Sequence, residues 1–137
     1  MMTHLLDTSI CVFLIRNRRS SVRRRFEAFK VGDLAISAIT EAELRFGADK
    51  SADPVRNHCQ LDRFFVTLPV VHFGSSAAIA YGRIRSELER AGTPIGPLDQ
   101  LIAAHARSLD LTLVTNNTDE FRRIRNLKLE DWSEKGQ

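Results

Sequence analysis

The sequence predicts an α/β domain of three layers, α/β/α, in which a short, mostly parallel sheet lies between two layers of helices. Short apolar segments alternate with helical segments along the chain, which is typical of parallel strands joined by helices. The strand segments are almost wholly apolar, as expected for a sheet covered on both faces. The length of 137 residues fits one domain, residues 1–137, with enough chain to build a core.

The first half of the chain begins with a strand at His4–Leu6, which ends at Asp7. The segments expected next are a buried helix at 10–15, a second helix through the arginine-rich stretch to Phe29, a strand at 34–37, a helix at 39–50 and a helix at about 54–65. The helix at 39–50 is predicted because one face carries Ile39, Ala42, Glu43, Phe46, Gly47 and Lys50, three or four residues apart.

The second half contains three further strands and three helices. A strand begins at Pro69–Val71, and a helix with apolar spacing follows between Ser75, an expected N-cap, and Gly92, an expected stop. Pro97 opens the next helix, whose inner face is predicted to carry Leu98, Leu101, Ile102, His105 and Leu109. The remaining segments are expected to be a strand at 111–114, a short helix capped by Thr118 and ending at Phe121, and a last strand around Leu127 and Leu129.

The charge of the chain favours an anionic partner. The formal net charge is +3, and arginines gather in two places. These are Arg16, Arg18, Arg19, Arg23, Arg24 and Arg25 in one stretch, and Arg122, Arg123 and Arg125 in the other. Each arginine alone is best interpreted as part of a solvated helix face. Two such groups in a small domain favour contact with the phosphates of a nucleic acid.

The sequence also indicates a compartment. No basic segment followed by a long apolar run opens the chain, so a secretory signal is not expected. The longest apolar run, Ile10–Ile15, is too short to span a bilayer. Cys11 and Cys59 lack the spacing of metal ligands, and we expect them to be reduced, buried thiols of a cytoplasmic protein.

Two acidic residues stand out in the first half. Asp7 follows the first strand, where it serves equally well as a helix N-cap or as a site residue in the crevice above the sheet. Glu43 lies on the apolar face of its helix. Burial of an ionised carboxylate is costly unless it is paired or binds a metal, so Glu43 either binds a cation, pairs with an arginine or lies at the edge of the apolar stripe.

More polar and acidic residues follow in the second half. Asp99 lies in the first turn after Pro97, where the helix dipole alone favours an acid. Residues 115–117 (TNN) follow an apolar strand and precede Asp119 and Glu120, which turn chemistry would also explain. Acids gathered at one edge of a sheet repel each other unless a cation is present. Oxygen ligands suit Mg²⁺ or Mn²⁺, and the lack of Cys/His spacing argues against zinc.

The chain resembles the PIN-domain ribonucleases, specifically the VapC toxins of bacterial toxin–antitoxin pairs. The residues that carry the resemblance are 5–9 (LLDTS), 36–44 (ISAITEAEL), 92–99 (GTPIGPLD), 113–117 (LVTNN), 120–121 (EF) and 130–132 (EDW). They span nearly the whole chain, in the order and with the spacing of the family.

The resemblance implies a PIN fold with an acidic pocket for one or two Mg²⁺ or Mn²⁺ ions. Asp7, Glu43 and Asp99 match the first three acids of the family, and Glu120 matches the fourth in the branch with a Thr-Asn-Asn turn. Thr8 and Thr115 match positions that help to orient the acids. Asn117 stands where many PIN domains have aspartate, which leaves open whether Glu120, Asp119 or Asn117 completes the cluster. Ser9 replaces the usual asparagine, so its contact with the acids is expected to differ.

The resemblance also implies a substrate and partners. Members of the family cleave RNA, often tRNA, and some relatives cut initiator tRNA in its anticodon arm. A cognate VapB-like antitoxin usually blocks the pocket, and the complex of the two proteins binds its own promoter DNA. A homodimer is expected. The arginines that we expect to contact RNA are Arg16, Arg18, Arg19, Arg23, Arg122 and Arg123.

Two other classes of function were weighed. One kind of phosphotransferase with Asp7 as acceptor needs a second aspartate two residues later, where Ser9 stands. Another kind needs an acidic pair near the start of the chain and a lysine after a late strand, and neither is found in the sequence. A non-catalytic nucleic-acid-binding module, with structural acids, is the remaining alternative. Manganese density between Asp7 and Asp99 would favour the nuclease over this module.

Overall fold

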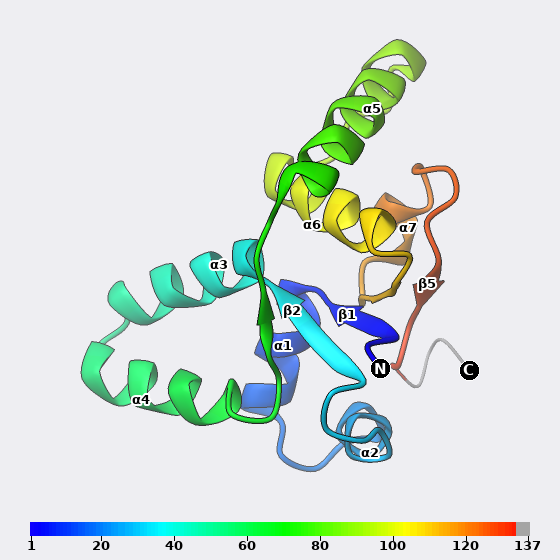
Figure 1. Ribbon diagram of the computed structural model, residues 1–137. Helices are drawn as coiled ribbons and strands as arrows, with labels where there is room; N and C mark the ends of the chain where they lie inside the picture. The colour runs from blue at the N-terminus through cyan, green and yellow to red at the C-terminus, as the bar shows by residue number, and fades with distance from the viewer. Residues whose placement is uncertain (134–137) are drawn as a thin grey trace.

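The computed structural model describes residues 1–133 as helices packed around a five-stranded sheet (Figure 1). The predicted domain ends at residue 137, so its last four residues lie outside the described part. The strands are β1 (His4–Leu6), β2 (Leu34–Ser37), β3 (Val70–Val71), β4 (Thr112–Val114) and β5 (Leu129–Glu130). The helices are α1 (Thr8–Arg16), α2 (Ser21–Glu27), α3 (Ala38–Asp49), α4 (Pro54–Phe64), α5 (Ser75–Ala91), α6 (Pro97–Ser108) and α7 (Thr118–Phe121).

The sheet has the strand order β3-β2-β1-β4-β5, and every pair of neighbours is parallel. The prediction of a mostly parallel sheet is therefore confirmed. β1 lies at the centre: the chain first builds outward through β2 and β3, then crosses to the other side of β1 to add β4 and β5. The strand order thus reverses beside β1, and in open α/β sheets such a reversal leaves a crevice at the carboxyl ends of the strands.

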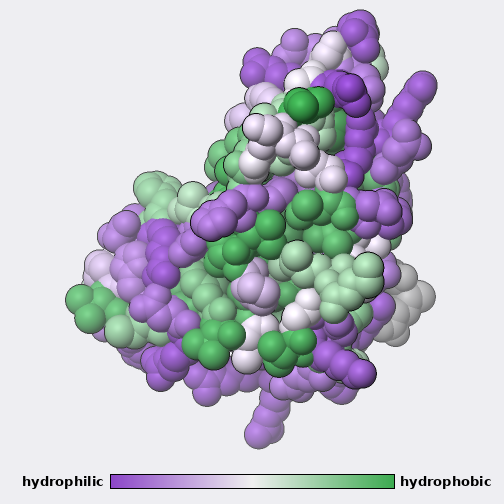
Figure 2. All heavy atoms as spheres, in the orientation of Figure 1, coloured by the Kyte–Doolittle hydropathy of each residue, from purple (hydrophilic) through white to green (hydrophobic). Residues whose placement is uncertain are grey.

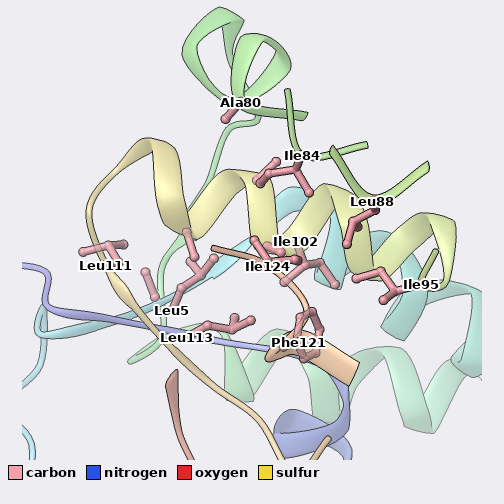
Figure 3. Packing of buried hydrophobic residues seen from close by; sticks show 14 residues of the cluster. Leu5, Ala80, Ile84, Leu88, Ile95, Ile102, Leu111, Leu113, Phe121 and Ile124 are labelled. Atoms are coloured by element: carbon pink, nitrogen blue, oxygen red, sulfur yellow. The ribbon is translucent and has the colours of Figure 1, made fainter. Parts of the chain in front are cut away.

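Successive strand residues point to opposite faces of the sheet, and both faces are covered. Leu5, Ala35 and Leu113 belong to one buried cluster, which includes side chains of α5 and α6. Figure 3 shows Ile84 and Leu88 of α5 and Ile102 of α6 in this cluster with Leu5 and Leu113. Their neighbours Leu6, Ile36 and Val114 belong to the second cluster, with side chains of α1, α2, α3 and α4. The predicted three-layer architecture is confirmed.

Local sequence explains most of the helix ends. Asp7, Ser20, Ser37 and Asp53 are N-caps whose side chains accept a hydrogen bond from a backbone N–H of the first turn. Gly92 ends α5 with a φ of 70°, a left-handed conformation that favours glycine. Two predicted caps are wrong by one residue. Gly74, not Ser75, precedes α5, and Asn117, not Thr118, precedes α7; neither makes a side-chain cap bond.

Several residues that helical spacing assigned to inner faces are exposed. Phe46 is 64% exposed, Leu98 43% and Leu109 39%. α3 extends beyond the sheet toward α4 (Figure 1), and the Lys50 ammonium covers the Phe46 ring at 5.1 Å. Leu98 lies in the first turn of α6 and Leu109 follows its last turn. Both side chains are therefore at the ends of the helix, beyond the buried core. Ala42 is exposed as well.

The two cysteines differ in their surroundings. Cys11 is buried, as predicted, and burial raises the pKa of its thiol. Cys59 is exposed on α4, so the expectation of a buried thiol is wrong there. His105, which the sequence placed in the core, is buried and lies 2.7 Å from the Ser37 hydroxyl at the end of β2. In the described part of the chain, no helix combines the length and the hydropathy needed to cross a membrane.

Candidate functional site

Asp7 lies directly after the central strand, at the point where the strand order reverses. Its side chain is buried, with the residue 3% exposed. Its backbone N–H donates to the carbonyl of Val114 at 3.0 Å, which fixes it between β1 and β4. Asp7 Oδ1 accepts hydrogen bonds from the N–H of Ile10 at 2.9 Å and from the Ser9 hydroxyl at 2.8 Å. Asp7 is thus a helix N-cap and, at the same time, a buried carboxylate at the carboxyl end of the central strand.

Glu43 reaches the same crevice from α3. Thr8 Oγ1 donates to Glu43 Oε1 at 2.6 Å, and the hydroxyl of buried Thr40 lies 3.3 Å from Thr8 Oγ1. Thr8 is the first residue of α1 and Glu43 is in the second turn of α3. The bond therefore couples the helices that follow β1 and β2, and it orients the Glu43 carboxylate. Glu43 is half-buried and has no arginine partner within the described residues.

Asp99 and Glu120 come from the second half of the chain. Asp99 lies in the first turn of α6, and Glu120 lies in α7, after β4. Glu120 Oε1 accepts the backbone N–H of Gly96 at 2.9 Å, and Oε2 accepts a hydrogen bond from the Asn117 side-chain amide. A Cβ atom on Gly96 would lie 3.6 Å from Asp99 Oδ2 and 3.7 Å from Glu120 Oε1. The Gly96 backbone thus lies against both carboxyl groups.

The charges of the four acids act on one another. Burial and the negative charges of Glu120, Asp7 and Glu43, together with a hydrogen bond to Glu120, raise the pKa of Asp99 to about 7. Burial also raises the pKa of Asp7, and the charge of Glu43 adds to this. Hydrogen bonds from Thr115, Ile10 and Ser9 lower the pKa of Asp7 and partly offset this rise. Asp99 thus lies in the negative field of Asp7, Glu43 and Glu120.

The donor set suits a hard divalent cation. All four acids offer oxygen atoms, and the pKa values of Asp7 and Asp99 are raised, first by burial and then by the negative charges of their neighbours. Within residues 1–133, no three acidic, histidine or cysteine side chains are close enough to form a complete metal site by themselves. Mg²⁺ is commonly held by one or two carboxylates and several waters, so the residues present fit this ion.

Thr115, Asn117 and Asp119, named with the acids in the sequence analysis, occupy different positions. Thr115 is buried after β4 and its hydroxyl accepts the N–H of Asn117 at 2.9 Å. Asn117 contacts Glu120, as described above. Asp119 is exposed and pairs with Arg122 at 3.2 Å. The structure therefore brings Thr115 and Asn117 to the acids and gives Asp119 a different partner.

The six arginines expected to contact RNA are spread over three regions. Arg16 lines a groove of about 450 Å³ together with Thr8 and Glu43. Arg18 and Arg23 line a neighbouring pocket of about 370 Å³, and Arg19 is exposed in the turn between α1 and α2. Two others lie near the acids on the opposite side of the sheet. Arg122 pairs with Asp119, and Arg123 donates to the carbonyl of Pro94 at 3.0 Å, so Arg123 holds the loop before α6.

Sequence reasoning missed three contributors to the site region. Thr40 supports Thr8 from within α3, and Gly96 presents its N–H to Glu120. Arg56 and Arg63 of α4 face Arg18 and Arg23 across the pocket. Thr40 is one turn before Glu43 on the same helix, which is a detectable signal. The sequence holds no comparable signal for α4, because the packing of α4 near α2 depends on the tertiary fold.

Comparison with protein families gives a match over most of the chain. The PIN domain family matches residues 4–127. The tRNA(fMet)-specific endonuclease VapC of Shigella flexneri is 47% identical over 97% of this chain and 100% of its own length. The ribonuclease VapC2 of Rickettsia felis is 43% identical over 96% of this chain and 98% of its own.

Comparison with solved structures agrees. The chain superimposes on the DNA-bound VapBC structure from Salmonella typhimurium with a TM-score of 0.92 and 45% identity, covering 96% of this chain and 99% of that one. A structure of VapBC2 from Rickettsia felis, bound to a DNA fragment from their promoter, gives a TM-score of 0.91 with 41% identity, covering 96% of this chain and all of that one.

Proposed function

This chain belongs to the PIN-domain family, and we propose that it is the toxin of a toxin–antitoxin pair, an endoribonuclease that cleaves tRNA at a metal-dependent acidic site. The observation that carries the proposal is the gathering of Asp7, Glu43, Asp99 and Glu120 in one negative field beside the central strand. The names of its relatives support the same activity and point to initiator tRNA, with the anticodon arm as the proposed place of cutting.

We assign Asp7, Asp99 and Glu43 as the residues that would hold Mg²⁺ or Mn²⁺, in part through bound water, because within residues 1–133 no three such side chains form a site by direct contact alone. When bound, such an ion supplies an activated water and offsets charge on the phosphate that is attacked. Asp7 has the most fixed position, since its Oδ1 accepts two hydrogen bonds and its backbone pairs with β4. Asp99 approaches from α6, across the crevice.

The remaining groups position these carboxylates. Thr8 orients Glu43 through its hydroxyl, and Thr115 lies beside Asp7 and lowers the pKa of its carboxyl. Glu120 uses both oxygens to join Gly96 to Asn117, which holds the loop before Asp99. In this assignment Glu120 completes the acidic cluster and fixes the approach of α6.

Partners follow from the same family. Solved relatives are toxin–antitoxin complexes, some of them on DNA, and we propose a VapB-like antitoxin as the partner of this chain, with promoter DNA bound only by the complex. We also propose a homodimer. Figure 2 shows apolar side chains across the middle of one face, bordered by polar ones, and a contiguous exposed apolar surface of this kind commonly marks an interface.

The test of the activity is cleavage by the purified protein. Initiator tRNA, elongator tRNAs and unstructured RNA are incubated with Mg²⁺, Mn²⁺ or EDTA, and the new RNA ends are sequenced. The expected result is cutting of initiator tRNA with either ion and none in EDTA. The Asp7→Asn protein is the matched control. Full cleavage in EDTA, or by Asp7→Asn, would refute the metal-dependent mechanism.

The test of the partner is made in cells. Brief expression of the chain alone is expected to arrest growth, and coexpression with the protein encoded beside it is expected to restore growth. Light scattering of the chain and of the complex gives the oligomeric state. Unchanged growth in a host that carries the cleaved RNA would contradict the toxin assignment, and a monomer at all concentrations would contradict the dimer.

A further inference from the structure

We propose that a pocket between α2 and α4 binds backbone phosphates of the RNA, away from the cleaved bond, through Arg18, Arg23, Arg56 and Arg63. This inference rests on the proposed ribonuclease function and extends it, because it gives the substrate a second point of attachment. Two of the four arginines come from α4, which the sequence did not connect with RNA.

The pocket concentrates positive charge without compensation. It has a volume of about 370 Å³, and all four arginines are among the residues that line it. Within residues 1–133, none of these four arginines forms an ion pair with a carboxylate, whereas Arg45 pairs with two carboxylates and Arg85 with one. Four like charges in one pocket repel each other. A polyanion would relieve this repulsion, and the planar fork of arginine matches phosphate oxygens.

Arg23 is held in place by the protein, with one buried nitrogen left unpaired within residues 1–133. Its Nη2 donates to the carbonyl of Leu14 at 2.6 Å, and its guanidinium lies over the Phe26 ring at 5.4 Å. Its Nε is buried and has no hydrogen-bond partner within the described residues. A buried donor without a partner is costly. The side chain is thus oriented by the protein before any ligand arrives, and its remaining Nη–H groups are the donors that it offers to a ligand in the pocket.

The pocket adjoins a groove that contains Glu43, one of the four acids. Ile15 and Gln60 line both this pocket and the groove of about 450 Å³ that contains Thr8, Arg16 and Glu43. The two cavities therefore meet along α1 and α4. A single RNA strand can follow this path, with its cleaved phosphate at the acids and a more distant phosphate at the four arginines.

The lining favours RNA over an acidic protein segment. Phe26 and Phe64 line the pocket together and stack with a centroid separation of 6.3 Å and an interplanar angle of 21°. Arginines combined with aromatic rings are typical of single-stranded nucleic-acid sites, where the rings stack on bases and the cations contact phosphates. A carboxylate-rich peptide would use the arginines and leave the rings without a matching group.

The experiment measures the affinity of full-length protein for fluorescent initiator tRNA at several salt concentrations. The Asp7→Asn protein serves as the parent, so that bound RNA is not cut. Arg56→Gln/Arg63→Gln is compared with Arg83→Gln/Arg90→Gln on α5 as a matched loss of charge elsewhere, and with Arg56→Lys/Arg63→Lys. Thermal melting checks that each variant is folded.

The glutamine pair in the pocket is expected to lower the slope of log affinity against log salt by about 1.4, because each phosphate contact to a single strand contributes about 0.7. At 0.15 M salt this corresponds to affinity about tenfold weaker. The lysine pair should keep most of the slope, and the α5 pair should match the parent. A decrease in slope in the lysine pair as large as in the glutamine pair would overturn the phosphate assignment, because lysine keeps the charge that each phosphate contact requires.

Other outcomes separate this inference from the proposed function. If wild-type protein cuts RNA while the glutamine pair binds tRNA with the parent's affinity and slope, the pocket does not hold RNA and the inference fails alone. If that pair instead loses affinity for the antitoxin, the pocket takes an acidic protein segment, and the inference is again overturned. If wild-type protein cuts no RNA, the proposed function fails, whatever the arginines bind.

Discussion

The hydroxyl of Thr8 donates a 2.6 Å hydrogen bond to the carboxylate of Glu43, 35 residues later in the chain. This bond joins the start of α1 to α3, and it sets the direction of an acid that the proposed mechanism places on the cation. It also occupies Glu43 Oε1 and leaves Oε2 for another partner.

Thr8→Val should reduce cleavage roughly tenfold to a hundredfold, because loss of a hydrogen bond to a metal-ligating group costs about that much. Metal affinity should fall with it. Thr8→Ser keeps the hydroxyl and should retain most of the activity. The measurement is kcat with Mg²⁺ titrated for each variant, and equal losses in Thr8→Ser and Thr8→Val would show that the methyl group matters, not the hydrogen bond.

Asp7→Asn and Asp99→Asn should each abolish detectable cleavage while RNA is still bound. Both changes keep the shape of the side chain and remove one negative charge from the cation site. The Asp99 variant should keep its fold, since Asp99 is only partly buried, and in EDTA near neutral pH it should melt no lower than wild type, because the change removes a charge that the neighbouring acids repel. Cleavage and tRNA affinity are measured on the same preparations, and loss of RNA binding together with activity would point to a structural role instead.

Glu120→Ala should lower cleavage through the position of the loop before α6. Glu120 is the acceptor for the Gly96 N–H, and its removal frees residues 92–97 in front of Asp99. Glu120→Gln keeps a carbonyl oxygen for that N–H, so it should recover part of the activity if positioning dominates. If Glu120→Gln is as inactive as Asp7→Asn, the charge of Glu120 is required on the cation itself.

The stability of the metal-free protein should fall as the pH rises from about 4 to about 7. The pKa of Asp99 is about 7 in the fold and 3.8 when unperturbed. The folded state thus binds this proton more tightly, so its stabilising effect is complete below pH 3.8 and is lost as the pH rises through 7. The melting temperature in EDTA, taken as the difference between wild type and Asp99→Asn, is the relevant measurement.

Added Mg²⁺ should stabilise the protein more as the pH rises. The cation binds the ionised carboxylate, so the increase in melting temperature on adding Mg²⁺ should be small at pH 5 and larger at pH 8. Asp99→Asn should show little increase at either pH. A stabilisation by Mg²⁺ that does not depend on pH would contradict the assignment of Asp99 as a ligand.

The sequence predicted the layers, the parallel sheet and the acids because each rests on local information. Leu5 and Leu6 are both apolar because both faces of the sheet are covered, and Asp7 follows them directly. Glu43 stood out because a carboxylate on an apolar helix face is costly to bury. Such signals need no knowledge of what the segment packs against.

The errors have a common physical origin in tertiary packing. Phe46 fits the apolar spacing of α3, yet α3 runs past the edge of the sheet, so the ring is exposed. Leu98 and Leu109 fall at the ends of α6, where the core no longer reaches. Arg56 and Arg63 were overlooked for the same reason, because a pocket between α2 and α4 exists only after both helices have docked.

The central position of β1 has a consequence for how the protein is made. β1 is synthesised first, yet one of its two neighbours, β4, begins at Thr112. Parallel pairing over so long a separation forms late in folding. Asp7 therefore leaves the ribosome long before the strand that fixes its backbone, and the acidic site is completed only after about residue 120 has emerged. Chains that end before residue 112 should therefore neither cleave RNA nor protect from exchange the amide of Asp7, which donates to Val114 in the complete fold.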